Sequence, residues 1–113
     1  MSGWTRRSAL RLAGAAFAAM ARRPAQAHNG HAHHRVEIRG LKFVPDVLTV
    51  RPEDTVTFVN RDIAPHTATA SDQSWDTGTL ARDAEATITV TAGMTQAYFC
   101  RFHPMMKGEL QPG

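Results

Sequence analysis

The sequence predicts an all-β sandwich of about seven to eight short strands. From Val36 onward, short segments rich in β-branched and aromatic residues alternate between apolar and polar positions, which is the period of a half-buried strand. Turn signals separate these segments at intervals of about 8 to 12 residues, as in sandwich folds. No part of this region carries the apolar period of a long helix, and the sequence contains no internal repeat.

The residues that flank each segment place the expected strands. In chain order these strands cover 36–39, 47–50, 55–60, 66–70, 86–91, 96–100 and 107–111. A further short apolar pair, 43–44, precedes the turn signal Pro45–Asp46. The segment 71–83 is polar and has no strong period, so we expect Trp75 and Leu80 to anchor it to the core.

The first 27 residues have the layout of an export signal. A basic start is followed by an alanine-rich apolar run over 9–20 and a small-x-small cleavage site at Ala25–Ala27. The run is too short for a membrane-spanning helix, so we expect no stable membrane insertion. The stretch Thr5–Arg11 resembles the twin-arginine signal, which implies export of a folded protein to the periplasm, although Ala9 stands where an aromatic is usual. An ordinary secretory signal and an amphipathic helix of the fold are the alternatives.

Cleavage after Ala27 changes the charge of the protein. The whole chain has a formal net charge of +3 and a sequence pI near 9.8. The leader holds five arginines and no acids, which leaves 8 Lys and Arg against 10 Asp and Glu, a net charge of −2. The basic pI is therefore a property of the leader, and it does not indicate a nucleic-acid partner.

Residues 28–35 are expected to form a flexible, histidine-rich tail before a single domain over 36–113. Four of the six histidines lie in 28–34, where no apolar period occurs. Two interpretations of the tail stay open, namely loose capture of copper or zinc and a polar linker. We expect the mature protein to be a monomer.

The chemistry of the chain centres on Cys100, which is the only cysteine. An imidazole follows at His103 and a thioether at Met106, and a thiolate, an imidazole and a thioether together suit copper. A lone cysteine cannot form an internal disulfide, and in an oxidising compartment it is a liability unless it is buried or bound to metal. One more ligand must come from elsewhere, and His66 is the candidate. Zinc also binds one cysteine and two histidines, but a methionine ligand makes it the less suitable metal.

Residues 36–112 resemble a small blue copper protein of the cupredoxin family. The matching pieces are, in order, Phe43–Pro45, Val50–Asn60, Pro65–His66 and Cys100-x-x-His103-Pro-x-Met106-x-Gly108. The two-residue gaps between the three residues of the last piece resemble the amicyanin branch, which has a short ligand loop. The resemblance implies a Greek-key β-sandwich with one copper ion, Cu(I) or Cu(II), at one end.

The resemblance also implies a role for each matched position. His66, Cys100 and His103 are the strong ligands, and Met106 is the weak axial one. Met105 is the alternative axial ligand, because it lies beside Met106. Ordinary core packing is the alternative role of both methionines.

Two further positions are expected to support the ligands. Asn60 falls where the family often has an asparagine that ties the ligand loops together. Thr67 stands where an asparagine is usual; its backbone N–H can still donate to the sulfur of Cys100, but a side-chain link between the loops must differ.

The resemblance implies a one-electron carrier that docks briefly with redox proteins such as a c-type cytochrome or a dehydrogenase. The apolar residues expected around the exposed ligand edge suit a small, transient interface; they are Ile63, Ala64, Pro65, Phe102, Pro104 and Met105. The alternative function is a periplasmic carrier or store of copper, which the histidine-rich tail suggests. We expect no enzyme of the multicopper oxidase or nitrite reductase type, because those families place histidines beside the cysteine, whereas here Phe99 and Arg101 flank it.

Overall fold

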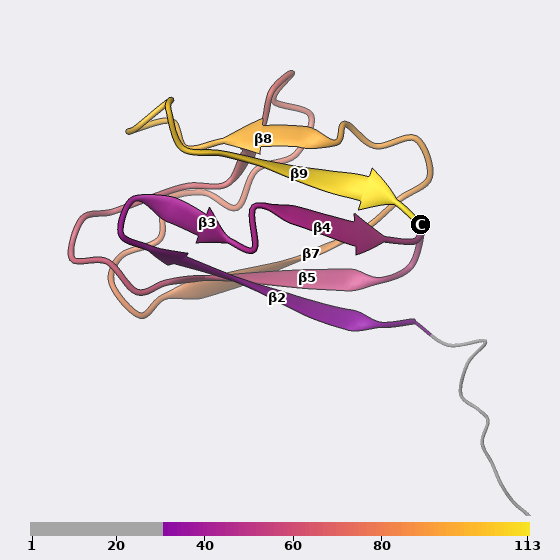
Figure 1. The fold of residues 1–113 in the computed structure, drawn as a ribbon, viewed down its shortest axis with the longest axis horizontal. Helices are drawn as coiled ribbons and strands as arrows, with labels where there is room; N and C mark the ends of the chain where they lie inside the picture. The colour runs from indigo at the N-terminus through magenta and orange to yellow at the C-terminus, as the bar shows by residue number, and fades with distance from the viewer. Residues whose placement is uncertain (1–30) are drawn as a thin grey trace, which may run out of the picture. The chain divides into compact units, whose positions relative to one another are not determined.

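The computed structural model of the chain describes residues 31–113, so the predicted export signal and residues 28–30 of the predicted tail lie outside the described residues. Within 31–113 the chain forms two four-stranded sheets (Figure 1). This range contains strands, turns and loops but no helix, and so none of its residues belongs to a helix that could cross a membrane. The predicted all-β sandwich is confirmed.

The strands in chain order are β2 (His33–Arg39), β3 (Lys42–Val44), β4 (Val47–Val50), β5 (Thr55–Asn60), β6 (Thr69–Ala70), β7 (Glu85–Thr89), β8 (Ala97–Phe99) and β9 (Lys107–Pro112). One sheet has the order β3-β2-β5-β7 and the other has the order β4-β9-β8-β6. The chain crosses from the first sheet to the second between β3 and β4, and β4 then pairs in parallel with the distant β9. Likewise β2 pairs in parallel with β5. These crossings between the layers are typical of a Greek-key sandwich.

Side chains that alternate along the strands fill the space between the two sheets. Ile38 and Phe58 of the first sheet are fully buried, as a period of two requires. Tyr98 of the second sheet meets Phe58 edge-on, with 5.4 Å between the ring centroids. Trp75 stacks on Phe58, and Leu80 is also buried. The two residues predicted to anchor segment 71–83 therefore pack against the core.

The first described strand begins three residues earlier than the predicted one. His33 and His34 belong to β2, where they lie opposite Thr55 and Val56 of β5. The carboxylate of Asp54 holds this start in place, since it accepts the N–H of Ala32 at 2.9 Å and lies 2.9 Å from the Nε2 of His34. The predicted tail therefore contributes three residues, 33–35, to the sheet, because pairing with β5 continues beyond the apolar alternation.

The two loops that carry the predicted ligands meet at one end of the sandwich. β2 finishes beside the end of β5, with Ile38 opposite Asn60, and the loop to His66 follows directly. The turn from β8 to β9 lies at this same end, where β2 finishes, whereas β2 begins at the opposite end (Figure 1). The histidines at 33 and 34 are thus at the far end from Cys100.

Candidate metal centre

The structure brings His66, Cys100 and His103 together. One donor atom from each side chain lies within 4.8 Å of the others. The Sγ of Cys100 is 3.6 Å from the Nδ1 of His66 and 3.9 Å from the Nδ1 of His103. His66 and Cys100 are fully buried, while His103 is only partly buried. A site with two imidazoles and one thiol is therefore present, and one imidazole edge reaches the surface.

A compact loop between β8 and β9 turns its ligand candidates inward. The N–H of Cys100 donates to the carbonyl of Met106 at 3.1 Å, and the N–H of Met106 donates to the carbonyl of His103 at 2.8 Å. The N–H of His103 in turn donates to the carbonyl of Cys100 at 3.2 Å. The loop lies between the paired residues Phe99 and Lys107, and these bonds close it. The backbones of residues 100 and 106 are therefore closer together than a helix would place them.

Burial distinguishes the two adjacent methionines that the sequence left as alternatives. Met106 is 2% exposed and belongs to the hydrophobic core, whereas Met105 is 72% exposed. Only the side chain of Met106 is therefore packed inside the protein next to the loop that carries Cys100 and His103.

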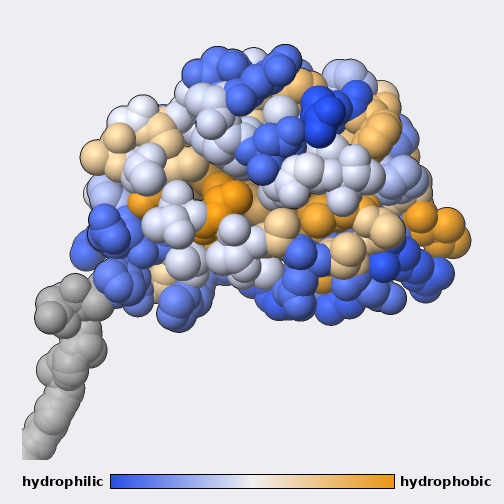
Figure 2. Space-filling view, turned by 180° about the vertical axis from the view of Figure 1, so that it is seen from behind, coloured by the Kyte–Doolittle hydropathy of each residue, from blue (hydrophilic) through white to orange (hydrophobic). Residues whose placement is uncertain are grey.

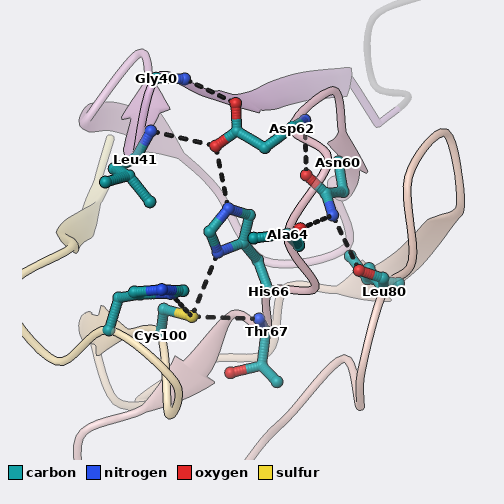
Figure 3. Close-up of polar contacts among 10 residues, drawn as sticks. Gly40, Leu41, Asn60, Asp62, Ala64, His66, Thr67, Leu80 and Cys100 are labelled. Atoms are coloured by element: carbon teal, nitrogen blue, oxygen red, sulfur yellow. Dashed lines mark hydrogen bonds and ion pairs between the residues drawn. The ribbon is translucent and has the colours of Figure 1, made fainter.

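The carboxylate of Asp62 orients His66. Its Oδ2 lies 2.9 Å from the Nε2 of His66, so a proton on that nitrogen is shared with the carboxylate and Nδ1 is left facing Cys100 (Figure 3). Asp62 is itself held by the N–H groups of Gly40 at 2.7 Å and Leu41 at 3.0 Å. Burial raises the pKa of the Asp62 carboxyl, but the hydrogen bonds from Leu41, Gly40 and His66 outweigh it, and the pKa lies below its ordinary value.

The turn between β2 and β3 is thus a support for the site, which the sequence analysis missed. Gly40 and Leu41 both have a φ of 60°, and this left-handed turn aims their two N–H groups at one carboxylate. A usable signal was present, because Asp62 lies four residues before a candidate histidine ligand and metal-binding histidines commonly pair with a carboxylate.

Asn60 ties down the loop that leads to His66. Its Nδ2 donates to the carbonyls of Ala64 and Leu80, each at 2.8 Å, and its Oδ1 accepts the N–H of Asp62 at 2.8 Å (Figure 3). All these partners lie before β7, so in the described residues Asn60 stabilises the His66 loop rather than the loop from Cys100 to Met106.

Thr67 connects the two ligand loops. Its N–H points at the Sγ of Cys100 at 3.4 Å, as the sequence analysis expected. Its Oγ1 accepts the N–H of Arg101 at 3.0 Å and lies 2.9 Å from the Oγ1 of Thr69. The threonine side chain therefore makes the link between loops that the missing asparagine would otherwise provide.

An ion pair extends this link to the segment before β7. The guanidinium of Arg101 donates to the Oδ2 of Asp76 at 3.0 Å, and the hydroxyl of Thr69 donates to the Oδ1 of the same carboxylate at 3.0 Å. Arg101 also approaches Thr69 at 3.4 Å through its Nε. The sequence analysis did not single out these three residues, because nothing local indicates that positions 69, 76 and 101 meet.

Apolar side chains surround this end of the protein on its surface. Ile63 is 82% exposed and Phe102 is 50% exposed, and with Met105 they come from the two ligand loops. Pro65 and Pro104 are exposed beside them. Figure 2 shows strongly hydrophobic surface at the end of the molecule farthest from the start of β2.

Comparison with known proteins agrees with this fold and site. Residues 10–111 match the family described as "Cupredoxin-like domain". The chain belongs to the cupredoxin-like family. The predicted membership is therefore confirmed. No curated protein matches the sequence.

Solved structures of amicyanins resemble this cupredoxin. Amicyanin from Paracoccus versutus shares 26% identity with a TM-score of 0.62, and the match covers 72% of this chain and 81% of that one. A reduced amicyanin variant shares 26% identity with a TM-score of 0.63 over 78% of this chain and 87% of that one. A Cu(I) form of another amicyanin variant shares 27% identity with a TM-score of 0.63 over the same shares of 78% and 87%.

The donor set of this cupredoxin fits one copper ion. Two imidazoles, one thiolate and one thioether combine nitrogen ligands suited to both oxidation states with the soft sulfur ligands that select copper. The thiol of Cys100 is free and fully buried, so it is not exposed to the oxidising chemistry that a lone surface cysteine would meet.

Proposed function

We propose that this cupredoxin is an exported one-electron carrier that holds a single copper ion. The observation that carries the proposal is the convergence of His66 Nδ1, Cys100 Sγ and His103 Nδ1 beside the buried Met106. These four side chains are the proposed ligands, with Met106 as the weak axial one. When bound, copper supplies the one-electron chemistry by alternating between Cu(I) and Cu(II).

The role of the protein residues is to keep the ligand geometry constant through both oxidation states. Asp62 prevents the ring of His66 from turning, and the turn at Gly40 and Leu41 keeps Asp62 in place. The N–H of Thr67 directs a partial positive charge at the Cys100 sulfur and so stabilises a thiolate there. A rigid set of ligands lowers the reorganisation that accompanies each electron transfer.

Electrons are proposed to leave and enter through His103, since it is the partly exposed imidazole of the site. Ile63, Phe102 and Met105, with Pro65 and Pro104, form the proposed docking surface around that ring. An exposed apolar surface of a few side chains suits a brief encounter with a c-type cytochrome or a dehydrogenase. The carrier is proposed to act as a monomer.

The periplasm is the proposed location, because residues 1–27 read as an export signal of the twin-arginine type. The proposal therefore concerns the chain that begins at His28. The charge of this mature chain is −2, and no nucleic-acid or membrane partner is proposed for it.

The test is to load the mature protein with Cu(II) and record its visible and paramagnetic-resonance spectra. We expect an intense charge-transfer band from the thiolate, a narrow copper hyperfine splitting, and rapid electron exchange with a c-type cytochrome. Absence of the band would contradict the copper site. A band without electron exchange, together with transfer of Cu(I) to an acceptor protein, would favour a carrier or store of copper instead.

A further inference from the structure

A surface pocket of about 270 Å³ lies directly beside the ligand loop. Its lining consists of Leu41, Lys42, Phe43, Asp46, Met105, Met106 and Lys107. The two methionines share this pocket although their exposure is very different, at 72% for Met105 and 2% for Met106. One exposed and one buried methionine therefore meet at the same surface pocket.

The chemistry of this pocket favours Cu(I) over the other metals that an exported protein meets. Thioether sulfur is a soft ligand, which binds Cu(I) well and binds Zn²⁺, Mg²⁺ or Ca²⁺ poorly. Asp46 is the single carboxylate among the lining residues, which also include Lys42 and Lys107. The two ammonium groups repel a divalent cation more strongly than a monovalent one.

Two other routes to the site are less favourable, while the edge of His103, the partly exposed ligand, stays open to solvent. His66 is fully buried behind the carboxylate of Asp62 and the turn at Gly40 and Leu41. His33 and His34 lie where β2 begins, opposite Thr55 and Val56, while the site adjoins the far end of that strand. A strand rises roughly 3.3 Å per residue, so the start of β2 is on the order of 15–20 Å from the end that adjoins the site.

We propose that Met105 and Met106 form an entry site through which Cu(I) reaches Cys100, an inference that rests on the proposed function. Met105 would accept Cu(I) from a soluble donor, and Met106 and Cys100 would then hold it. Copper remains Cu(I) throughout. A bond to the donor's ligand breaks as the bond to Met105 forms, and the thiol of Cys100 releases its proton to solvent as its sulfur binds. Met105 has no role in holding copper afterwards.

The test is the rate at which the apoprotein removes Cu(I) from its bicinchoninate complex without oxygen, followed by loss of the complex's colour. We expect Met105→Leu to load several-fold more slowly than the native chain. Because the side chain is exposed and leucine keeps its apolar volume, the fold should be unaffected. The final copper content, the Cu(II) spectrum and the reduction potential should stay the same.

Phe102→Leu is the matched control, because it changes an exposed apolar side chain of the same loop without removing sulfur. It should load Cu(I) at the native rate. The proposal is overturned if Met105→Leu loads at the native rate, or if Phe102→Leu is slowed equally, since loss of apolar surface would then explain the effect. If the native protein takes up no copper, the proposed function fails together with the entry site. If the native protein binds copper and shows the charge-transfer band, but Met105→Leu loads at the native rate, only the entry-site proposal fails.

Discussion

Asp62 Oδ2 lies 2.9 Å from His66 Nε2, on the side of the imidazole ring away from Cys100. The ring is therefore held between a carboxylate and the thiol, and the carboxylate is held by the turn between β2 and β3. A carboxylate in this position fixes the ring orientation and makes the other ring nitrogen a stronger electron-pair donor to a metal ion.

Replacing this carboxylate should weaken copper binding. In Asp62→Asn the side chain keeps its shape but loses its charge and one acceptor oxygen, so we expect roughly a 10- to 100-fold loss of Cu(II) affinity. A less basic imidazole stabilises Cu(II) less, and the reduction potential should rise. Competition with a Cu(II) chelator and voltammetry measure both effects. Asp83→Asn is the control, because that exposed carboxylate pairs with Arg61 instead, and an equal effect there would contradict a specific role for Asp62.

The axial position should affect the potential without controlling the colour. Met106→Leu is expected to keep the charge-transfer band and to raise the reduction potential, because the weak axial ligand tunes the potential while the Cys100 thiolate is the source of the band. Cys100→Ser should abolish the band. Visible spectra and voltammetry of both variants and of Met105→Leu decide the assignment: a change of potential in Met105→Leu with none in Met106→Leu would make Met105 the axial ligand.

The Thr67 hydroxyl should contribute to stability more than to colour. In Thr67→Val the N–H of Arg101 loses its acceptor, which should cost about 1–3 kcal/mol of unfolding free energy. The backbone N–H that points at Cys100 remains, so the band should persist. Urea unfolding of the apoprotein measures the loss, and Thr67→Ser should recover most of it. A valine variant as stable as the native chain would mean that this hydroxyl does not link the loops.

Protonation of Asp54 in acid should weaken its contacts with the start of β2 and lower the stability of the protein. The N–H of Ala32, the side chain of His34 and the N–H of Arg51 lower the pKa of Asp54 from 3.8 to about 2, against the opposing effect of burial. A lowered pKa in the folded state stabilises the protein above the unfolded value, and this contribution is lost as the pH falls from about 4 toward 2. The pKa values of Asp62 and Asp72 are also lowered, so these groups contribute over the same pH range. The contribution of Asp54 must therefore be isolated by comparing the native protein with an Asp54 variant.

Asp54→Asn should therefore reduce the difference between the unfolding free energies at neutral and acid pH. Denaturant unfolding at several pH values between about 2 and 6 measures this difference. We expect the stabilities of the native and variant proteins to converge at the acid end. A constant gap between them across the whole range would show that the charge of Asp54 does not stabilise the start of β2.

The sequence by itself determined the class of fold and the identity of the donor set. The alternation over 86–91 became β7, and the segments near 55 and 107 became β5 and β9, because period and turn residues are local properties. The spacing of Cys100, His103 and Met106 was equally local, and it indicated copper before any coordinates. Where the local pattern was weak the prediction was less accurate: the expected strand over 66–70 is reduced to β6, with His66 joined to Leu80 only by an isolated bridge.

Only the tertiary structure decided how the site is supported and where it opens to solvent. The contacts of Asp62 with the turn at Gly40, and of Arg101 with Asp76, join residues more than twenty positions apart. Such contacts depend on how the two sheets pack and on which strands pair, and no periodicity along the chain carries that information. The same packing buried Met106 and left the adjacent Met105 in solvent, because the turn that ends the loop carries only the second of the two side chains into the core.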